Sequence, residues 1–176
     1  MCRDVKKEPV LQPLVGIENL PRSSNTSSEA RLDISARGFW VAGQKAFFDV
    51  RVFNPLAKRY ATCDPQKSYE LNEREKKREY NERIMQIEHA SFTPLVFSAT
   101  GGAGRECKKF CKRLAELLSE KSQLSYAQNV SWLQRKVNFM LLRSIHTCFR
   151  GSRSTEIRPL TNYNVNVSEA LTAIRQ

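Results

Sequence analysis

The chain has 176 residues, of which 40% are apolar, and its formal net charge is +11 at pH 7. This length and this apolar fraction suit one domain with a hydrophobic core, and they exclude a wholly disordered tail. A chain this basic is expected to bind a polyanion, and nucleic acid is the commonest candidate.

The sequence also lacks the patterns of a membrane-spanning protein and of a zinc-binding module. No apolar run approaches the roughly 18 residues of a membrane span, and the N-terminus has no signal-peptide core. The five cysteines form no CxxC pair, and neither histidine lies at zinc-finger spacing from them. Cys107, Cys111 and Cys148 fall on apolar helix faces and are predicted to be buried. These features favour a reducing compartment, nuclear or cytoplasmic.

Residues 1–29 are predicted to form an extended, proline-broken segment that ends in a polar loop. The next segment, residues 30–54, is predicted to form a β-hairpin that turns near Val41. In this hairpin Asp33 falls opposite Asp49, although both lie in apolar strands where an ionised carboxylate is costly.

Side chains alternate along a strand, so Arg51 is predicted to share the face of Asp49. Directly opposed carboxylates repel each other. A divalent metal or Arg51 would relieve the repulsion between Asp33 and Asp49. The hairpin therefore predicts a metal site suited to hydrolysis.

A charged segment from Ser68 to His89 contains no glycine or proline and is predicted to be helical. Six residues share a narrow arc at 3.6 residues per turn: Tyr69, Glu73, Lys76, Tyr80, Ile84 and Ile87. Glu73 and Lys76 are therefore expected on the packing side. The alternative is that they lie beside the tyrosines with their charges toward solvent.

A third strand is predicted over Phe92–Ser98, with Pro94 at its start or on a sheet edge. A glycine-rich turn, Ser98–Gly104, follows and leads into amphipathic helices over residues 105–121 and 126–149. The turn is expected to be structural, although its backbone N–H groups could hold a phosphate. The outer side of the first of these helices collects five cations, Arg105, Lys108, Lys109, Lys112 and Arg113. This face is predicted to bind DNA, and residues 154–176 are predicted to form a polar tail.

The segments Leu32-Asp33-Ile34 and Phe48-Asp49-Val50-Arg51-Val52 resemble the PD-(D/E)xK restriction-endonuclease-like superfamily. The likeness is specifically to the restriction-like endonucleases of non-LTR retrotransposons. It extends over about residues 4–153 and is carried by further segments: Ala30–Ile34, Gly38–Trp40, Phe47–Pro55, Glu75–Tyr80, Ser91–Ser98, Leu141–Ser144 and Arg150–Arg153.

The resemblance implies an α/β (α+β) domain over residues 30–153, with a mixed central β-sheet flanked by helices and a truncated first helix. It implies Mg²⁺ or Mn²⁺ held by Asp33 and Asp49. The catalytic lysine of such nucleases can be displaced onto the following helix, where Lys76 fits this role and Lys77 is the reserve. Arg51 replaces the usual strand lysine, and an arginine can neutralise phosphate but not readily act as a base.

The resemblance further implies a retroelement-derived endonuclease that nicks DNA, with a reverse transcriptase as a partner in the parent element. The chain is then expected to be a fragment of a longer protein. Two alternatives remain open at this point. One is a non-catalytic nucleic-acid-binding module with a decayed nuclease fold. The other is a structural protein whose aspartates form buried ion pairs with Arg31 and Arg51.

Overall fold

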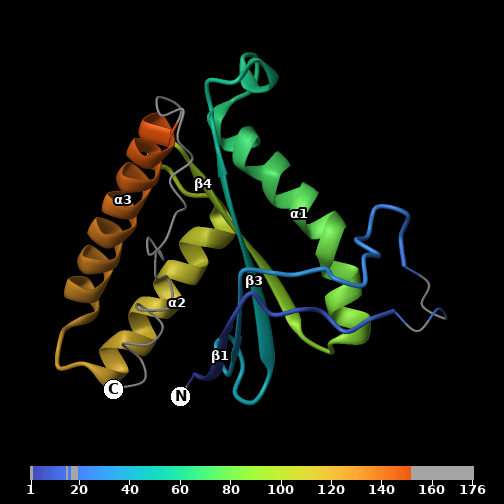
Figure 1. Ribbon diagram of the computed structural model, residues 1–176. Coiled ribbons are helices and arrows are strands. Elements are labelled where there is room, and N and C mark those ends of the chain that lie inside the picture. Colours follow the sequence, from blue (N-terminus) through green and yellow to red (C-terminus); the bar gives the residue numbers. More distant parts are fainter. Residues whose placement is uncertain (1, 15, 17–19, 152–176) are drawn as a thin grey trace.

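Four strands and three long helices make up the computed structural model, which describes residues 2–14, 16 and 20–151 (Figure 1). The predicted tail, residues 154–176, lies outside the described residues. In chain order the elements are β1 (Arg3–Lys7), β2 (Ile34–Arg37), β3 (Lys45–Phe53), a 3₁₀ turn (Lys58–Tyr60), α1 (Pro65–Ile87), β4 (Ser91–Ser98), α2 (Arg105–Lys121) and α3 (Tyr126–Gly151).

The strands form one mixed sheet in the order β1-β2-β3-β4. β1 and β3 each pair antiparallel with β2, whereas β4 pairs parallel with β3. A parallel pair needs a crossover connection, and α1 supplies it. α1 lies on one face of the sheet, and α2 and α3 lie on the other (Figure 1). The predicted mixed sheet flanked by helices is confirmed.

Local signals explain where α1 begins and ends. The Asp64 carboxylate accepts hydrogen bonds from the amides of Gln66 and Lys67, and Pro65 occupies the first helical position, where its missing N–H is not needed. The helix ends at Ile87, and His89 adopts a left-handed φ of 48° before β4 begins. Tyr80 and Ile84 are buried on the predicted packing arc.

Alternation along β3 divides the apolar residues between the two faces of the sheet. Phe48 lies on the α2 side, where Phe39 stacks on Phe110 with ring centroids 4.8 Å apart. Phe47 points the other way and packs with Ile84 of α1. Asp49 lies two residues after Phe47 and therefore on the same face of the sheet, so its carboxylate points toward α1.

The N-terminal segment contributes more to the fold than an extended chain with a loop. It supplies β1, and Leu11 is only 1% exposed beneath α1. Arg83 of α1, also fully buried, holds this segment through backbone carbonyls. Its guanidinium donates to the carbonyl oxygens of Asn25 (2.7 Å), Ser27 (2.8 Å) and Gln12 (2.8 Å).

The two edge strands are irregular. The pairing of β1 shifts register between Arg3 and Lys6, and Asp4 has a left-handed φ of 51°. β4 carries Pro94, which is tolerated at this position because an edge strand has one unpaired side. The predicted edge position of Pro94 is confirmed.

All five cysteines are free thiols. Cys107 is buried, as predicted, whereas Cys111 is only partly buried and the prediction that Cys148 is buried is wrong. Cys148 lies near the end of α3, where the helix has passed the core that covers Leu133 and Leu141. Among the described residues, none of the helices combines the length and the apolarity needed to cross a bilayer.

Arg83→Ala should lower the free energy of unfolding by about 3–5 kcal/mol, because three backbone carbonyls lose a buried, charged donor. Urea denaturation measures this loss, and hydrogen exchange should show faster exchange in residues 24–32. Arg78→Ala removes an exposed arginine from the same helix and should change stability by less than about 0.5 kcal/mol. Equal effects of the two substitutions would contradict the role given to Arg83.

Candidate metal and nucleic-acid site

Asp49 is the most buried acid of the predicted site, with 7% of its surface exposed. Nζ of Lys76 lies 2.8 Å from its Oδ2 atom, so β3 and α1 meet through an ion pair. Burial raises the pKa of Asp49, and the charges of Asp33 and Glu79 raise it further, whereas Lys76 acts in the opposite direction. The ion pair with Lys76 therefore offsets part of the cost of burying this carboxylate.

Asp33 lies one residue before β2, and the register that pairs Ile34 with Phe48 places it opposite Asp49. The predicted hairpin register is confirmed. Oδ2 of Asp33 accepts a hydrogen bond of 2.6 Å from the Val50 amide. Asp33 lies outside the paired residues of β2, so the Val50 amide bonds to the Asp33 side chain and not to a backbone carbonyl of β2. Asp33 itself remains exposed to solvent.

The structure separates the two neighbouring lysines of α1. Lys76 points inward, where its ammonium lies 5.4 Å from the centroid of the Tyr80 ring as well as beside Asp49. Burial alone would lower the pKa of Lys76, but the hydrogen bond and charge of Asp49 outweigh it and raise the pKa. Lys77 instead pairs with Glu106 of α2 at 3.1 Å. Lys76 is therefore the lysine that the fold brings to the aspartates, and its charge does not point to solvent.

Arg51 shares the face of Asp49, as predicted, but it has a different partner. Its guanidinium lies 2.8 Å from a carboxylate oxygen of Glu75, which Arg59 also contacts. Burial would raise the pKa of Glu75, but the hydrogen bonds from Arg59 and Arg51 outweigh it and lower the pKa. The ion pair predicted between Asp49 and Arg51 is therefore wrong, since Lys76 is the cation at Asp49.

Glu73 was predicted on the packing side, but its partner was not foreseen. Its Oε1 atom accepts a 3.0 Å hydrogen bond from the Glu106 amide, at the first turn of α2. A β-carbon at Gly104 would crowd this oxygen, so a larger residue there would displace the Glu73 carboxylate. Glu73 thus caps α2, since the first amides of a helix have no partner within it.

Asp33 and Asp49 supply carboxylate oxygens, the donor type that Mg²⁺ takes in proteins. One oxygen of each is engaged, whereas among the described residues no hydrogen bond reaches Oδ1 of Asp33 or Oδ1 of Asp49. Mg²⁺ is commonly bound through one or two carboxylates together with water and phosphate oxygens. Within the described part of the chain, no three His, Cys, Asp or Glu side chains converge on a metal-binding position. Glu79 lies three residues after Lys76 on α1 and pairs with it. This i+3 spacing was the signal in the sequence that Glu79 lies near the site.

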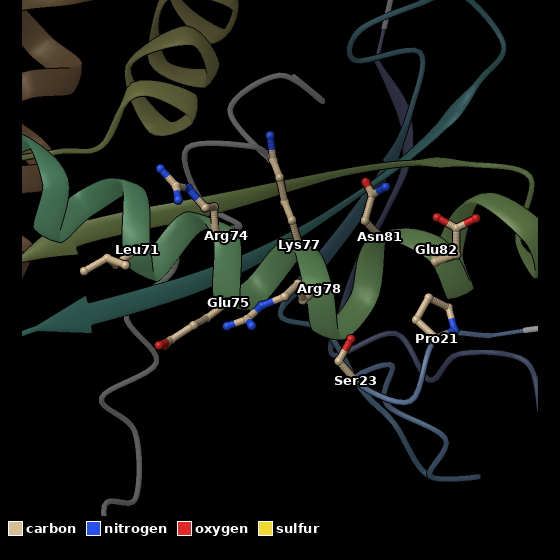
Figure 2. A pocket seen from close by; sticks show the side chains of 9 residues that line it. All are labelled: Pro21, Ser23, Leu71, Arg74, Glu75, Lys77, Arg78, Asn81 and Glu82. Carbon is tan, nitrogen blue, oxygen red and sulfur yellow. The ribbon is translucent and has the colours of Figure 1, made fainter.

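A groove of about 590 Å³ lies on the opposite side of α1 from this site (Figure 2). Its walls are Pro21 and Ser23 of the N-terminal loop and the outer side chains of α1, among them Arg74, Lys77 and Arg78. The groove is open and mixed in charge, and α1 separates it from Asp49. We therefore do not place the candidate site there.

The predicted DNA-binding face of α2 divides into free and engaged cations. Arg105, Lys108 and Lys112 are exposed, and none of them joins an ion pair among the described residues. Lys109 lies 3.5 Å from Glu106. Arg113 is partly buried, where it donates to the Phe39 carbonyl and pairs with Glu116. Three of the five cations therefore remain fully available to an anionic partner.

The backbone amides of the glycine-rich turn before α2 donate hydrogen bonds within the protein. The Gly102 amide donates to the Ser98 hydroxyl, and the amides of Gly101 and Gly104 donate to the carbonyls of Ser98 and Val96. The expected structural role of the turn is supported, whereas these amides are not available to hold a phosphate.

Comparisons with protein-family models, with curated proteins and with solved structures find no match to this chain.

Substitution of Glu73 by glutamine should change how stability depends on pH. Burial raises the pKa of Glu73 above its ordinary value of 4.5, and the charge of Glu106 adds to this, against the Glu106 amide and Lys77. The parent therefore loses stability as the pH rises through 4.5 to the folded pKa, because the folded state holds the proton more tightly. Glutamine keeps the acceptor oxygen without the charge. The difference in unfolding free energy, Glu73→Gln minus parent, should thus rise with pH across this window in urea titrations. A difference that falls with pH would contradict the pKa direction.

Proposed function

We propose that this protein is a metal-dependent DNA endonuclease domain that nicks its target. The observation that carries the proposal is the position of Lys76, 2.8 Å from Asp49 and on the face of the sheet where Asp33 stands opposite. Two carboxylates and one cation, brought together from two strands and a helix, are the groups that phosphodiester hydrolysis requires.

Each residue has a distinct role in this proposal. Asp33 and Asp49 would hold Mg²⁺ or Mn²⁺, and the bound metal would lower the pKa of a coordinated water. Lys76 opposes the burial that raises the pKa of Asp49. When a phosphate enters, the Lys76 ammonium is the cation placed to stabilise the developing negative charge. Arg51, engaged by Glu75, braces β3 against α1.

The resemblance to restriction-like endonucleases of retroelements agrees with this division of roles. In that setting the substrate is double-stranded DNA, and a reverse transcriptase of the same element is the partner that extends the nicked strand. In this proposal the exposed cations of α2 would bind the DNA backbone.

A second candidate is a non-catalytic nucleic-acid-binding module. The closed ion pair between Asp49 and Lys76 favours it, because a satisfied pair is also a stable way to bury a carboxylate. In this case the basic face of α2 would bind DNA and the aspartates would hold the sheet together.

A nicking assay on supercoiled plasmid with Mg²⁺, and then with Mn²⁺, tests the first candidate. Lys76→Ala should slow nicking by about 10²–10³-fold, since it removes one charge-stabilising group. Asp49→Asn should abolish nicking and weaken Mn²⁺ binding. Lys77→Ala is the matched control and should nick at nearly the parent rate, because Lys77 contacts Glu106 instead. An inert parent would favour the non-catalytic module, and equal loss from both lysine variants would remove Lys76 from its role.

DNA affinity should depend on the free cations of α2. Replacing Arg105, Lys108 and Lys112 by alanine should weaken binding similarly for all sequences and flatten the plot of log K against log salt by about 2–3 units. A triple variant at Lys58, Lys67 and Arg78 removes the same charge from exposed positions elsewhere. Fluorescence anisotropy over a salt series measures both. If the control flattens the slope as much, DNA does not bind preferentially to α2.

A further inference from the structure

A cavity of about 500 Å³ lies between α2, α3 and the turn that follows β4. Its lining is largely apolar, with Phe97 of β4 and Val130, Leu133 and Val137 of α3. Phe97 points to the side of the sheet opposite Asp49, so the cavity is separate from the candidate metal site. At one end Tyr69 closes against the turn, where a β-carbon at Gly102 would lie 1.9 Å from its hydroxyl.

Two lysines of α2 line this cavity. Lys108 and Lys112 are one helical turn apart and exposed, and neither has an acidic partner among the described ion pairs. Like charges at this spacing repel each other on a helix. Lys109, between them in sequence but turned away, is paired with Glu106. An anion beside the cavity would relieve the repulsion between Lys108 and Lys112.

The wall contributed by α3 carries amides. Gln134 and Asn138 are also one turn apart, and both line the cavity. A side-chain amide offers two donors and an acceptor, the combination that pairs with the edges of nucleobases. The cavity thus combines cations on α2, amides on α3 and an apolar lining with aromatic rings from Phe97 and Tyr69.

We propose that this cavity binds a nucleotide, with the base between the amides and the apolar lining and the phosphate on Lys108 and Lys112. Its volume lies within the range of about 300–1,000 Å³ typical of small-molecule sites. An aliphatic acid would leave the amides unused, and inorganic phosphate would leave the apolar lining unused. The same chemistry, a flat ring carrying a phosphate, is offered by a free mononucleotide and by an unpaired nucleotide within a DNA strand.

Isothermal titration calorimetry with dAMP tests the proposal on the full chain without metal. Deoxyadenosine lacks the phosphate and inorganic phosphate lacks the ring, and each should bind at least about tenfold more weakly than dAMP, because each loses one set of contacts. Cys111 lines the cavity, so a change in the reactivity of its thiol reports whether the ligand is bound there. A hydrogen bond from Cys107 lowers the pKa of the Cys111 thiol, which favours its reaction with N-ethylmaleimide. Bound dAMP should slow this reaction at Cys111 but not at exposed Cys148, as read by mass spectrometry.

Paired variants distinguish the site from general attraction to a basic protein. Lys108→Ala combined with Lys112→Ala should weaken dAMP binding at least about tenfold, whereas Lys109→Ala should leave it within about twofold. Val137→Phe should also weaken it by filling the cavity, and circular dichroism checks that this variant folds. No heat of binding with millimolar dAMP, no protection of Cys111, or an equal effect of Lys109→Ala would overturn the proposal.

A further arm separates the two sources of the nucleotide. 2-Aminopurine placed at an unpaired position of a duplex should change its fluorescence on binding, and Val137→Phe, which fills the cavity without removing a cation, should abolish the change, if the ligand is part of DNA. No change, together with dAMP binding, assigns the cavity to a free mononucleotide. Asp49→Asn should bind dAMP as the parent does. A failure of nicking therefore leaves this result intact, and a failure of dAMP binding leaves the nuclease proposal intact.

Discussion

Several polar side chains of helix α1 each pair with a different part of the fold. Glu73 caps α2, Lys76 meets Asp49 of β3, and Arg83 holds the N-terminal segment. Two turns into the helix, Asn72 exchanges hydrogen bonds with Tyr60. A buried polar group destabilises the fold unless it has a partner, so each of these contacts constrains the position of α1 along and around its own axis. The candidate site depends on this constraint, because a small rotation of α1 would move the Lys76 ammonium away from Asp49.

The elements that follow a simple periodicity could be predicted from the sequence. The alternation around Asp49 gave the correct face for Arg51 and the correct register for Asp33, since a strand has only two sides. The arc through Tyr80 and Ile84 correctly placed Lys76 toward the sheet. The amphipathic patterns of α2 and α3 were strong enough to fix both helices closely.

What the sequence did not reveal are partners that follow no period. Arg83 binds carbonyls of residues 56 to 71 positions away, in a segment whose sequence shows no alternation, so nothing local points to the contact. Glu73 was placed on the correct side of α1, but its partner is a backbone amide, which every residue offers equally. Arg51 was one of two groups, the other being a metal, expected to relieve the repulsion at Asp49, because Arg51 and Asp49 share a face. In the structure the long side chain of Arg51 extends to α1 and pairs there with Glu75.

The irregular edges of the sheet have a consequence for association with other proteins. An edge strand with free amides and carbonyls is a template on which another chain can add a strand. Here the outer edge of β1 is interrupted by its register shift and carries Arg3 and Lys6, and β4 carries Pro94 in its middle. Chain addition at either end of the sheet is therefore disfavoured, which protects the protein from edge-to-edge aggregation. Its partners are left with the helical surfaces, where the exposed cations of α2 and the exposed Trp132, Phe139 and Leu142 of α3 are found.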